Sequence, residues 1–332
     1  MKKTLSILLL SVMSTALFAE YTTYDDLIKI VDSLTSLKPE IIVKKSFGVT
    51  TGGRELFAVK ISDNASVNEY EPEIGFDAGT HGNEVVAQEM VYRFMRELVR
   101  SYDSDTLVKR YVDSREIWIF PLISPDGRME LNRLTHGVNL NRDWGFYWSP
   151  EFLGESPFEL VETRAAARWV LDNRFVIHQT NHDGAALFAY HWGFAQKKSA
   201  DSTHFTLLGN RFESFSPYIQ VGFYTSGNVG TGSMFSYGVM GTMGFTMEVH
   251  GTINPPYSDS IVNLRWSTQR GSMYEMLNCA GTGIKGYVKD ASTQKPLQAT
   301  VHVRQIGAGV LRPSFTEPTN GDYHRFLAAG SY

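Results

Sequence analysis

The sequence predicts an α/β protein in which helices cover both faces of a mixed, mostly parallel sheet, followed by a small all-β unit. Between residues 24 and 280, short apolar runs alternate with helical patterns, as in sheets covered by helices on both faces. After residue 281, short runs separated by turns replace the helical patterns, which is typical of β structure. The length of 332 residues also favours more than one domain.

The first 19 residues have the pattern of a secretory signal peptide. Lys2 and Lys3 precede an apolar run at residues 5–17, and Phe18-Ala19 places the cleavage point after Ala19. The run is shorter than the roughly 20 residues that cross a bilayer, so we expect no membrane span after signal removal. The short Lys-Lys signal is of bacterial type, and we expect a monomer in the periplasm or outside the cell.

The net charge and the cysteine content limit the possible ligands and the possible covalent cross-links. The net charge is −4, which gives no electrostatic reason to bind nucleic acid. Cys279 is the only cysteine, so no intrachain disulfide is possible and the fold depends on its core.

The first predicted elements are a helix and three strands. Apolar residues at helical spacing predict a helix over residues 24–37. Residues 41–47 and 55–61 are extended stretches, and the intervening Thr51-Gly52-Gly53-Arg54 has the chemistry of a hairpin turn. The apolar run at residues 74–78 predicts a third strand.

The next elements continue the alternation. Residues 85–99 have one apolar face and predict a helix. Residues 116–120 form an apolar strand that Pro121 ends, and a helix at 158–171 precedes a strand at 175–180. Because ligands bind at the carboxyl ends of strands in such sheets, the junction between residues 78 and 85 is a predicted site.

We expect a catalytic domain at residues 20–281 and a β domain at 282–332. Residues 283–288 and 299–303 have strand patterns, and turns are predicted at 290–296 and 320–321. The chain stops as another strand begins, so we expect this β domain to be incomplete.

His81 and Glu84 are the first candidate metal ligands. A histidine and a carboxylate three residues apart can bind one divalent ion, and a hydrolytic zinc site needs a third protein ligand. His182, at the end of the strand at 175–180, is the preferred third ligand. His178 is an alternative on the same strand face, although it should lie deeper and serve as a hydrogen-bonded core residue.

Glu248 is the candidate general base. If Glu84 binds the metal, another carboxylate must take the proton of the attacking water. Glu248 lies in an otherwise apolar segment, Phe245 to Val249. A buried ion pair would also explain a glutamate there.

Asn141 and Arg142 are candidate ligands for a carboxylate. A guanidinium holds a carboxylate through two parallel hydrogen bonds, and an asparagine amide can add a further donor. The alternative is a turn in which Asn139, Asn141 and Asp143 act as caps.

Together these residues resemble a known family. His81-x-x-Glu84, Ser124-Pro125-Asp126-Gly127, Leu140-Asn141-Arg142, His182 before Asp183-Gly184, and Thr246-Met247-Glu248 occur in the order of the zinc carboxypeptidases, the funnelin metallocarboxypeptidases. The resemblance covers residues 24–280. Residues 286–288, with Asp290, and residues 296–297 and 330–332 resemble the transthyretin-like domain of the carboxypeptidase N/E-type subfamily.

The resemblance implies one zinc ion bound by His81, Glu84 and His182, with Glu248 as general base and proton donor. Asn141 and Arg142 would bind the terminal carboxylate of a peptide or protein substrate. Arg133 is the best match for the arginine that stabilises the oxyanion, with Arg128 as the alternative. Tyr224 best matches the mobile tyrosine that closes over the substrate, with Tyr237 as the alternative.

Two departures from the family pattern concern affinity and specificity. Asn139 stands where the family usually has an aspartate that orients a zinc histidine, which predicts weaker zinc binding. Gly232-Ser233-Met234 carries no acid near the expected side-chain pocket, which argues against a strict preference for C-terminal Lys or Arg.

The sequence therefore predicts an exported zinc carboxypeptidase in which Glu248 activates a zinc-bound water. An alternative substrate is the stem peptide of the bacterial cell wall, since export would place the enzyme beside that polymer. A third hypothesis, an inactive peptide-binding relative, is disfavoured because no ligand or base is missing.

Overall fold

A computed structural model describes residues 20–152, 154–194, 198–223, 227–304, 306–307, 309–311 and 315–332. The predicted signal peptide, residues 1–19, lies outside this range. No helix in the described part of the chain is both long and apolar enough to cross a membrane.

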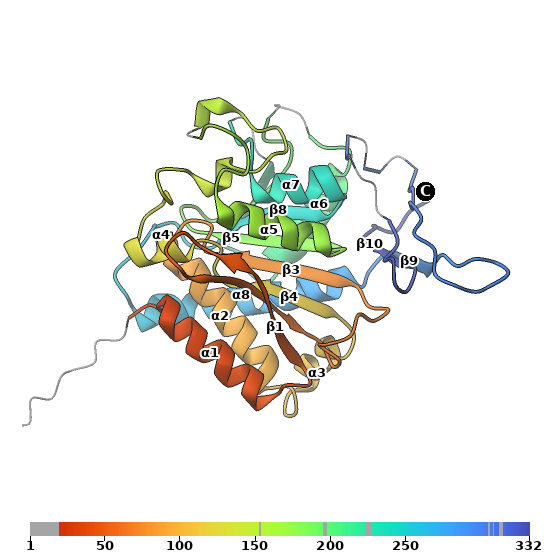
Figure 1. Ribbon diagram of the computed structural model, residues 1–332, viewed down its shortest axis with the longest axis horizontal. Helices are drawn as coiled ribbons and strands as arrows, with labels where there is room; N and C mark the ends of the chain where they lie inside the picture. Colours follow the sequence, from red (N-terminus) through yellow and green to blue (C-terminus); the bar gives the residue numbers. More distant parts are fainter. Residues whose placement is uncertain are drawn as a thin grey trace, which may run out of the picture.

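An eight-stranded sheet forms the centre of the molecule (Figure 1). Its central strands β4, β3, β5 and β8 are parallel, whereas β1 pairs with β2, β2 with β4, and β6 with β8 in antiparallel fashion. In spatial order the strands are β1 (Ile42–Val49), β2 (Glu55–Ile61), β4 (Glu116–Phe120), β3 (Glu73–Ala78), β5 (Ile177–His182), β8 (Met243–Glu248), β6 (Leu187–Tyr190) and β7 (Gln220–Phe223).

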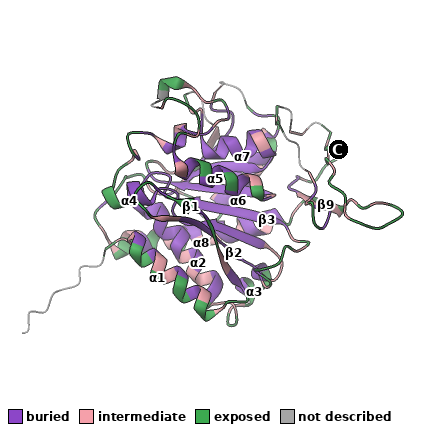
Figure 2. Ribbon diagram, viewed as in Figure 1, coloured by how far each residue is buried: buried purple, intermediate pink, exposed green. Residues whose placement is uncertain are grey.

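Helices cover both faces of the sheet (Figure 1). α1 (Tyr24–Leu37), α2 (Val85–Arg100) and α8 (Asp259–Ala280) pack together on one face, and α5 (Val161–Asp172) and α7 (Gly232–Met240) lie on the other. α6 (Ser202–Glu213) packs against β6, β7 and α8. The inner strands and the inner helix faces are buried, whereas the edge strands β1 and β7 are partly exposed (Figure 2). The remaining helices are short: α3 (Thr106–Val112), α4 (Pro125–Glu130) and the 3-10 turns Leu140–Arg142 and Pro150–Phe152.

The predicted fold class is confirmed for the larger part of the chain. The eight predicted elements all form within a few residues of their expected bounds, and the helix at 24–37 and the strands at 55–61 and 116–120 match completely. The predicted hairpin also forms, because β1 and β2 pair antiparallel across the turn at residues 51–54.

The C-terminal segment differs from the expected β sandwich. Its described residues form a two-stranded antiparallel sheet of β9 (Ile284–Tyr287) and β10 (Asp322–Arg325). Residues 299–303 do not form the expected strand, and Thr300 makes a single bridge to Phe315. The strand that pairs with β9 comes from far along the chain, which short alternating patterns do not reveal. A separate domain at 282–332 stays a prediction.

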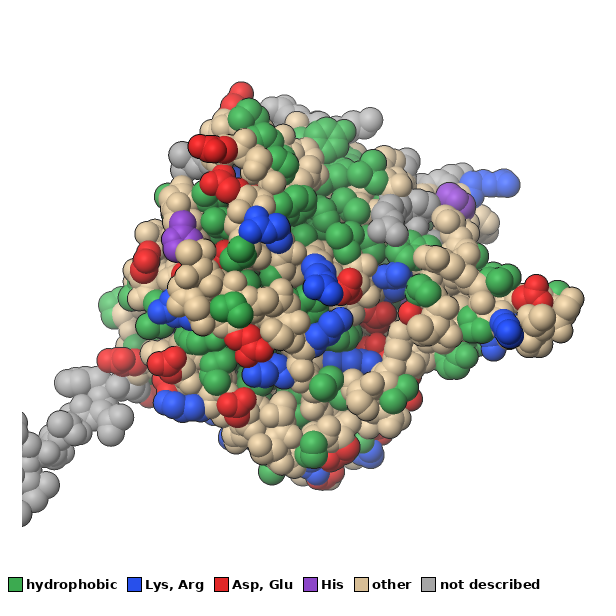
Figure 3. All heavy atoms as spheres, in the orientation of Figure 1, with side chains coloured by type: hydrophobic (Ala, Val, Ile, Leu, Met, Phe, Trp, Pro, Cys, Tyr) green, Lys and Arg blue, Asp and Glu red, His purple; other side chains and the backbone are tan. Residues whose placement is uncertain are grey.

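Charged side chains of both signs are interspersed over the face shown in Figure 3. This mixture agrees with the small net charge and differs from the single-sign surface that attracts nucleic acid.

The central parallel strands end at one edge of the sheet. Ala78 of β3 is paired with Asn181 of β5, and His182 of β5 with Glu248 of β8. Side chains that follow these strand ends are therefore brought together.

Candidate metal centre and active site

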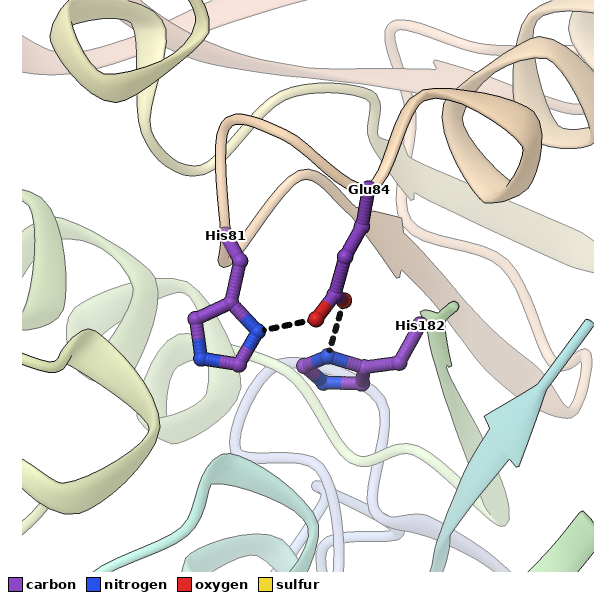
Figure 4. Close-up of side chains that lie close together, drawn as sticks. All are labelled: His81, Glu84 and His182. Carbon is purple, nitrogen blue, oxygen red and sulfur yellow. Dashed lines mark hydrogen bonds and ion pairs between the residues drawn. The ribbon is translucent and has the colours of Figure 1, made fainter. Parts of the chain in front are cut away.

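His81, Glu84 and His182 meet at this edge (Figure 4). His81 lies in the turn after β3, Glu84 directly precedes α2, and His182 ends β5. Each side chain is at most 2% exposed. His81 Nδ1 lies 2.6 Å from Glu84 Oε1, and His182 Nδ1 lies 2.8 Å from Glu84 Oε2. One ligand atom from each residue can be chosen so that all three lie within 4.8 Å of one another.

Asn139 orients His81. The amide oxygen of Asn139 lies 2.9 Å from His81 Nε2, and because an amide oxygen only accepts hydrogen bonds, Nε2 carries the proton. The lone pair of the neutral ring is then on Nδ1, the atom that faces Glu84. A His₂Glu set with an oriented imidazole fits a zinc ion.

The buried charges of the three side chains depend on one another. Burial acts to raise the pKa of Glu84, but His81 and His182 outweigh burial and hold this pKa well below its ordinary value. Burial acts to lower the pKa of His182, but Glu84 raises it to about 9. Burial lowers the pKa of His81, although Glu84 opposes this effect. Ligand histidines are neutral, so metal binding at neutral pH would release a proton.

The turn that carries His81 packs closely against α4. A Cβ on Gly82 would lie 1.9 Å from the carbonyl carbon of Gly127, so the two backbones touch and only glycine fits at position 82. The Gly82 N–H also donates to the Asn132 carbonyl oxygen at 3.0 Å. These contacts fix the path of the chain between β3 and α2.

The N-terminus of α2 is capped by Asp183, which lies outside the helix. Glu84 occupies the N-cap position, but its own side chain makes no cap hydrogen bond. Asp183 Oδ2 accepts hydrogen bonds from the N–H groups of Val86 at 2.9 Å and Ala87 at 3.1 Å. The residue after His182 thus holds the helix that follows Glu84, which ties the ligand-bearing segments together.

Glu248 lies at the end of β8, opposite His182 on the neighbouring strand. Its Oε2 atom is buried and has no hydrogen-bond partner in the described part of the chain. Burial raises the pKa of Glu248, and the nearby Glu84 raises it further, while His182 and Arg133 act to lower it. Among the described residues Glu248 makes no salt bridge, although His182 is close enough to lower its pKa.

The two candidate arginines lie in different surroundings. Arg133 Nη1 donates to Glu84 Oε1 at 2.9 Å and lies 3.2 Å from His81 Nδ1, and its side chain is 42% exposed. Arg128 is buried and donates to the carbonyl oxygens of Tyr21 and Thr22. The structure therefore brings Arg133, and not Arg128, to the ligands.

Asn141 and Arg142 form a short 3-10 turn near the N-terminus of α7. Asn141 Oδ1 accepts a hydrogen bond from the Gly232 N–H at 3.3 Å, and Arg142 Nη2 donates to Asn228 Oδ1 at 2.9 Å. The cap alternative is also realised in part, since Asn139 Oδ1 accepts from the Asn141 N–H.

Tyr224 lies outside the described residues. The alternative, Tyr237, is fully buried, and its hydroxyl donates to Asp201 Oδ2 at 2.9 Å. A tyrosine held in this way is not free to close over a substrate.

His178 occupies the hydrogen-bonded core position that we expected. It is fully buried, with Nδ1 2.6 Å from Ser236 Oγ and Nε2 2.7 Å from Asp77 Oδ2. Both ring nitrogens thus have protein partners away from Glu84.

Two supporting residues were missed by sequence reasoning. Asp183 was noted only as part of a motif, although an acid beside a ligand at a strand end is a usable signal for a helix cap. Asn228, the partner of Arg142, lies in a loop 86 residues away, and no local pattern marks it.

This fold and site define a class: α/β proteins that gather a His₂Glu metal-ligand set at the carboxyl ends of central parallel strands. The family model described as "Zinc carboxypeptidase" matches residues 27–262. The chain belongs to the zinc carboxypeptidase family.

Individual relatives support this assignment. "Carboxypeptidase SOL1" of Arabidopsis thaliana is 27% identical over 93% of this chain and 65% of its own length. "Zinc carboxypeptidase" of Saccharothrix mutabilis subsp. capreolus is 30% identical over 40% of this chain and 34% of its own length. The chain spans less than two thirds of the length of both relatives.

Solved structures share the fold at low sequence identity. The crystal structure of thrombin activatable fibrinolysis inhibitor has a TM-score of 0.67 at 15% identity, over 78% of this chain and 74% of that one. Carboxypeptidase A from Helicoverpa armigera has a TM-score of 0.64 at 16% identity, over 78% and 71% of the two chains.

Proposed function

We propose that the protein is a zinc-dependent carboxypeptidase that hydrolyses the C-terminal bond of peptides or proteins. The observation that carries the proposal is the convergence of His81, Glu84 and His182 on one point, with Glu248 on the adjacent strand. Zinc bound there would act as a Lewis acid, lowering the pKa of water and polarising the scissile carbonyl.

The protein side chains have separate roles in this proposal. Glu248 takes the proton from the attacking water and later gives it to the leaving amine. Arg133, beside the ligands and partly exposed, stabilises the negative charge that develops on the carbonyl oxygen. Arg142 and Asn141 hold the terminal carboxylate, which selects chain ends over internal bonds.

We further propose that the protein is exported and that residues 282–332 belong to a transthyretin-like domain. The charged start and apolar run of residues 1–19 support export. The antiparallel pairing of β9 with β10 supports a β unit after residue 281. Export of bacterial type would make cell-wall stem peptides a second candidate substrate, and Tyr224 would close over the bound substrate.

A panel of peptides with free and amidated C-termini tests the function. The purified protein with zinc should release single C-terminal residues from free peptides and none from amidated ones, because a neutral amide cannot form the bidentate, charge-assisted pair that a carboxylate forms with Arg142. A defined stem peptide in the same panel separates the two substrate classes. Absence of release from every free C-terminus would contradict the proposal.

Ligand variants test the metal assignment. His182→Ala should lose activity and the zinc ion of this site, whereas His178→Ala should retain that ion if its protein folds. Release of the metal by His178→Ala alone would show that the third ligand is misassigned.

A further inference from the structure

A second group of metal-ligand side chains lies outside the candidate active site. Asp126 of α4, His136 of the turn that precedes residues 139–142, and Glu162 of α5 each offer one atom within 4.8 Å of the others. Asp126 is 5% and Glu162 0% exposed, whereas the side chain of His136 is 42% exposed. The group is thus buried on two sides and reachable from solvent past His136.

Glu162 is the unusual member of this group. It is fully buried, and neither of its carboxylate oxygens accepts a hydrogen bond from another described residue. Buried polar atoms in folded proteins almost always have partners, and an unpaired buried carboxylate is costly. A cation between Glu162, Asp126 and His136 would provide the missing partner.

Asp126 is held in place from the opposite side. Its Oδ1 accepts hydrogen bonds from Thr50 Oγ1 at 2.7 Å and Arg54 Nη1 at 2.8 Å. Its Oδ2 accepts from the Gly52 N–H at 2.8 Å and lies 3.3 Å from His136 Nε2. Arg54 therefore pairs with one oxygen, while the other faces the imidazole.

The spacing of His136 and Asp126 suits two ligands of one ion. Ligand distances of about 2.0 to 2.2 Å around a tetrahedral zinc ion place neighbouring ligand atoms about 3.3 to 3.6 Å apart. The observed distance of 3.3 Å between His136 Nε2 and Asp126 Oδ2 lies at the lower end of this range. One imidazole and two carboxylates suit a divalent transition metal better than Ca²⁺ or Mg²⁺, which prefer oxygen ligands alone.

We propose that Asp126, His136 and Glu162 form a second binding site for a divalent transition-metal ion such as Zn²⁺. The ion joins α4, α5 and the turn at His136, three residues before Asn139. It thereby braces the segment that contacts His81 through Asn139 and carries Asn141 and Arg142.

Metal counting on the full-length protein tests the proposal. Wild-type protein dialysed against micromolar Zn²⁺ should hold two ions per chain. The variants His136→Gln and Glu162→Gln should each hold one, because their affinity for the second ion should be at least about tenfold weaker than that of wild type. His182→Ala should also hold one ion, and the His136→Gln/His182→Ala double variant should hold none. His302→Gln, which alters an exposed histidine elsewhere, is the matched control and should hold two.

The outcomes separate this site from the proposed catalytic one. Two ions that persist in both His136→Gln and Glu162→Gln, or one wild-type ion that only His182→Ala removes, would overturn the second site. One wild-type ion that His136→Gln removes and His182→Ala leaves would support the second site and contradict the catalytic assignment. Circular dichroism of His136→Gln, an exposed position, checks that loss of metal is not loss of fold.

Discussion

The carboxylate of Glu248 is the residue on which the proposed chemistry depends most. Replacing it with glutamine keeps the shape of the side chain but removes its ability to take a proton. We expect Glu248→Gln to lower kcat by about 10² to 10⁴-fold, the usual contribution of general acid–base catalysis, with unchanged zinc content.

The control is Glu130→Gln, which alters an exposed glutamate at the end of α4 and should leave kcat unchanged. Peptide hydrolysis and metal analysis on the same preparations give both quantities. Full activity of Glu248→Gln would assign the base to another residue.

Asn139 offers a second prediction at the scale of single residues. Its amide oxygen is 2.9 Å from His81 Nε2, and a carboxylate at the same place would make the imidazole a stronger ligand. We expect Asn139→Asp to tighten zinc binding by about tenfold, as measured by competition with a chelator. The new side chain can still accept from the Asn141 N–H, so the turn should be retained.

Asn132→Asp controls for the added negative charge. Asn132 is exposed and caps the neighbouring Leu134 N–H without touching His81. An equal gain in zinc affinity in both variants would show that the general charge of the region, rather than the contact with His81, sets the affinity.

At the scale of elements, the cap of α2 links the helix to the ligands. Asp183 Oδ2 accepts from two N–H groups of the first turn of α2. Asp183→Ala should lower the free energy of unfolding by about 1 to 2 kcal/mol, and it should weaken zinc binding because Glu84 and His182 flank the lost contact.

Asp105→Ala is the matched control, since Asp105 caps α3 through Leu107 and Val108 in the same way. It should reduce stability by a similar amount and leave zinc affinity unchanged. Urea unfolding and zinc competition measure the two effects. Unchanged zinc affinity in Asp183→Ala would limit the cap to a structural role.

The elements that were predicted best are those whose buried residues form a recognisable apolar pattern over a short stretch of sequence. β3 and β4 are buried along their whole length, and mostly apolar runs mark such strands. β5 is equally buried but carries five polar residues, so only its apolar start at residues 175–177 marked it in the sequence. α4 was not predicted as a helix, although Ser124 caps it and Pro125 begins it, because six residues give too little periodicity. α8 was missed because its buried positions do not form a clear apolar stripe.

At the scale of the whole molecule, strand order determines which of these residues meet. The sequence supported a joint role for His81, Glu84, His182 and Glu248 because each lies at the end of a predicted strand or in a motif. The partners of the site were harder to predict. Arg142 meets Asn228, and Asp77 meets His178, only because distant segments are packed together.

The opposite end of the sheet carries a cluster of acids that predicts how stability depends on pH. Glu73, at the start of β3, is buried near Glu116, and it accepts a hydrogen bond from the Arg174 N–H at 2.8 Å. The side chains of Asp322 and His324 help to line the adjoining cavity. Burial, reinforced by Glu116, raises the pKa of Glu73 from 4.5 to about 8.

This raised pKa means that the folded state binds a proton that the unfolded state has released. The stabilisation is complete below about pH 4.5 and is lost as the pH rises to about 8, because the unfolded state then binds fewer protons than the folded state. Glu73→Gln keeps the neutral form at every pH. We expect its free energy of unfolding, relative to wild type, to rise by about 3 to 4 kcal/mol between pH 5 and pH 8.5. Urea unfolding of both proteins at the two pH values measures this difference, and a difference that does not change with pH would show that Glu73 is already ionised in the folded protein at pH 5.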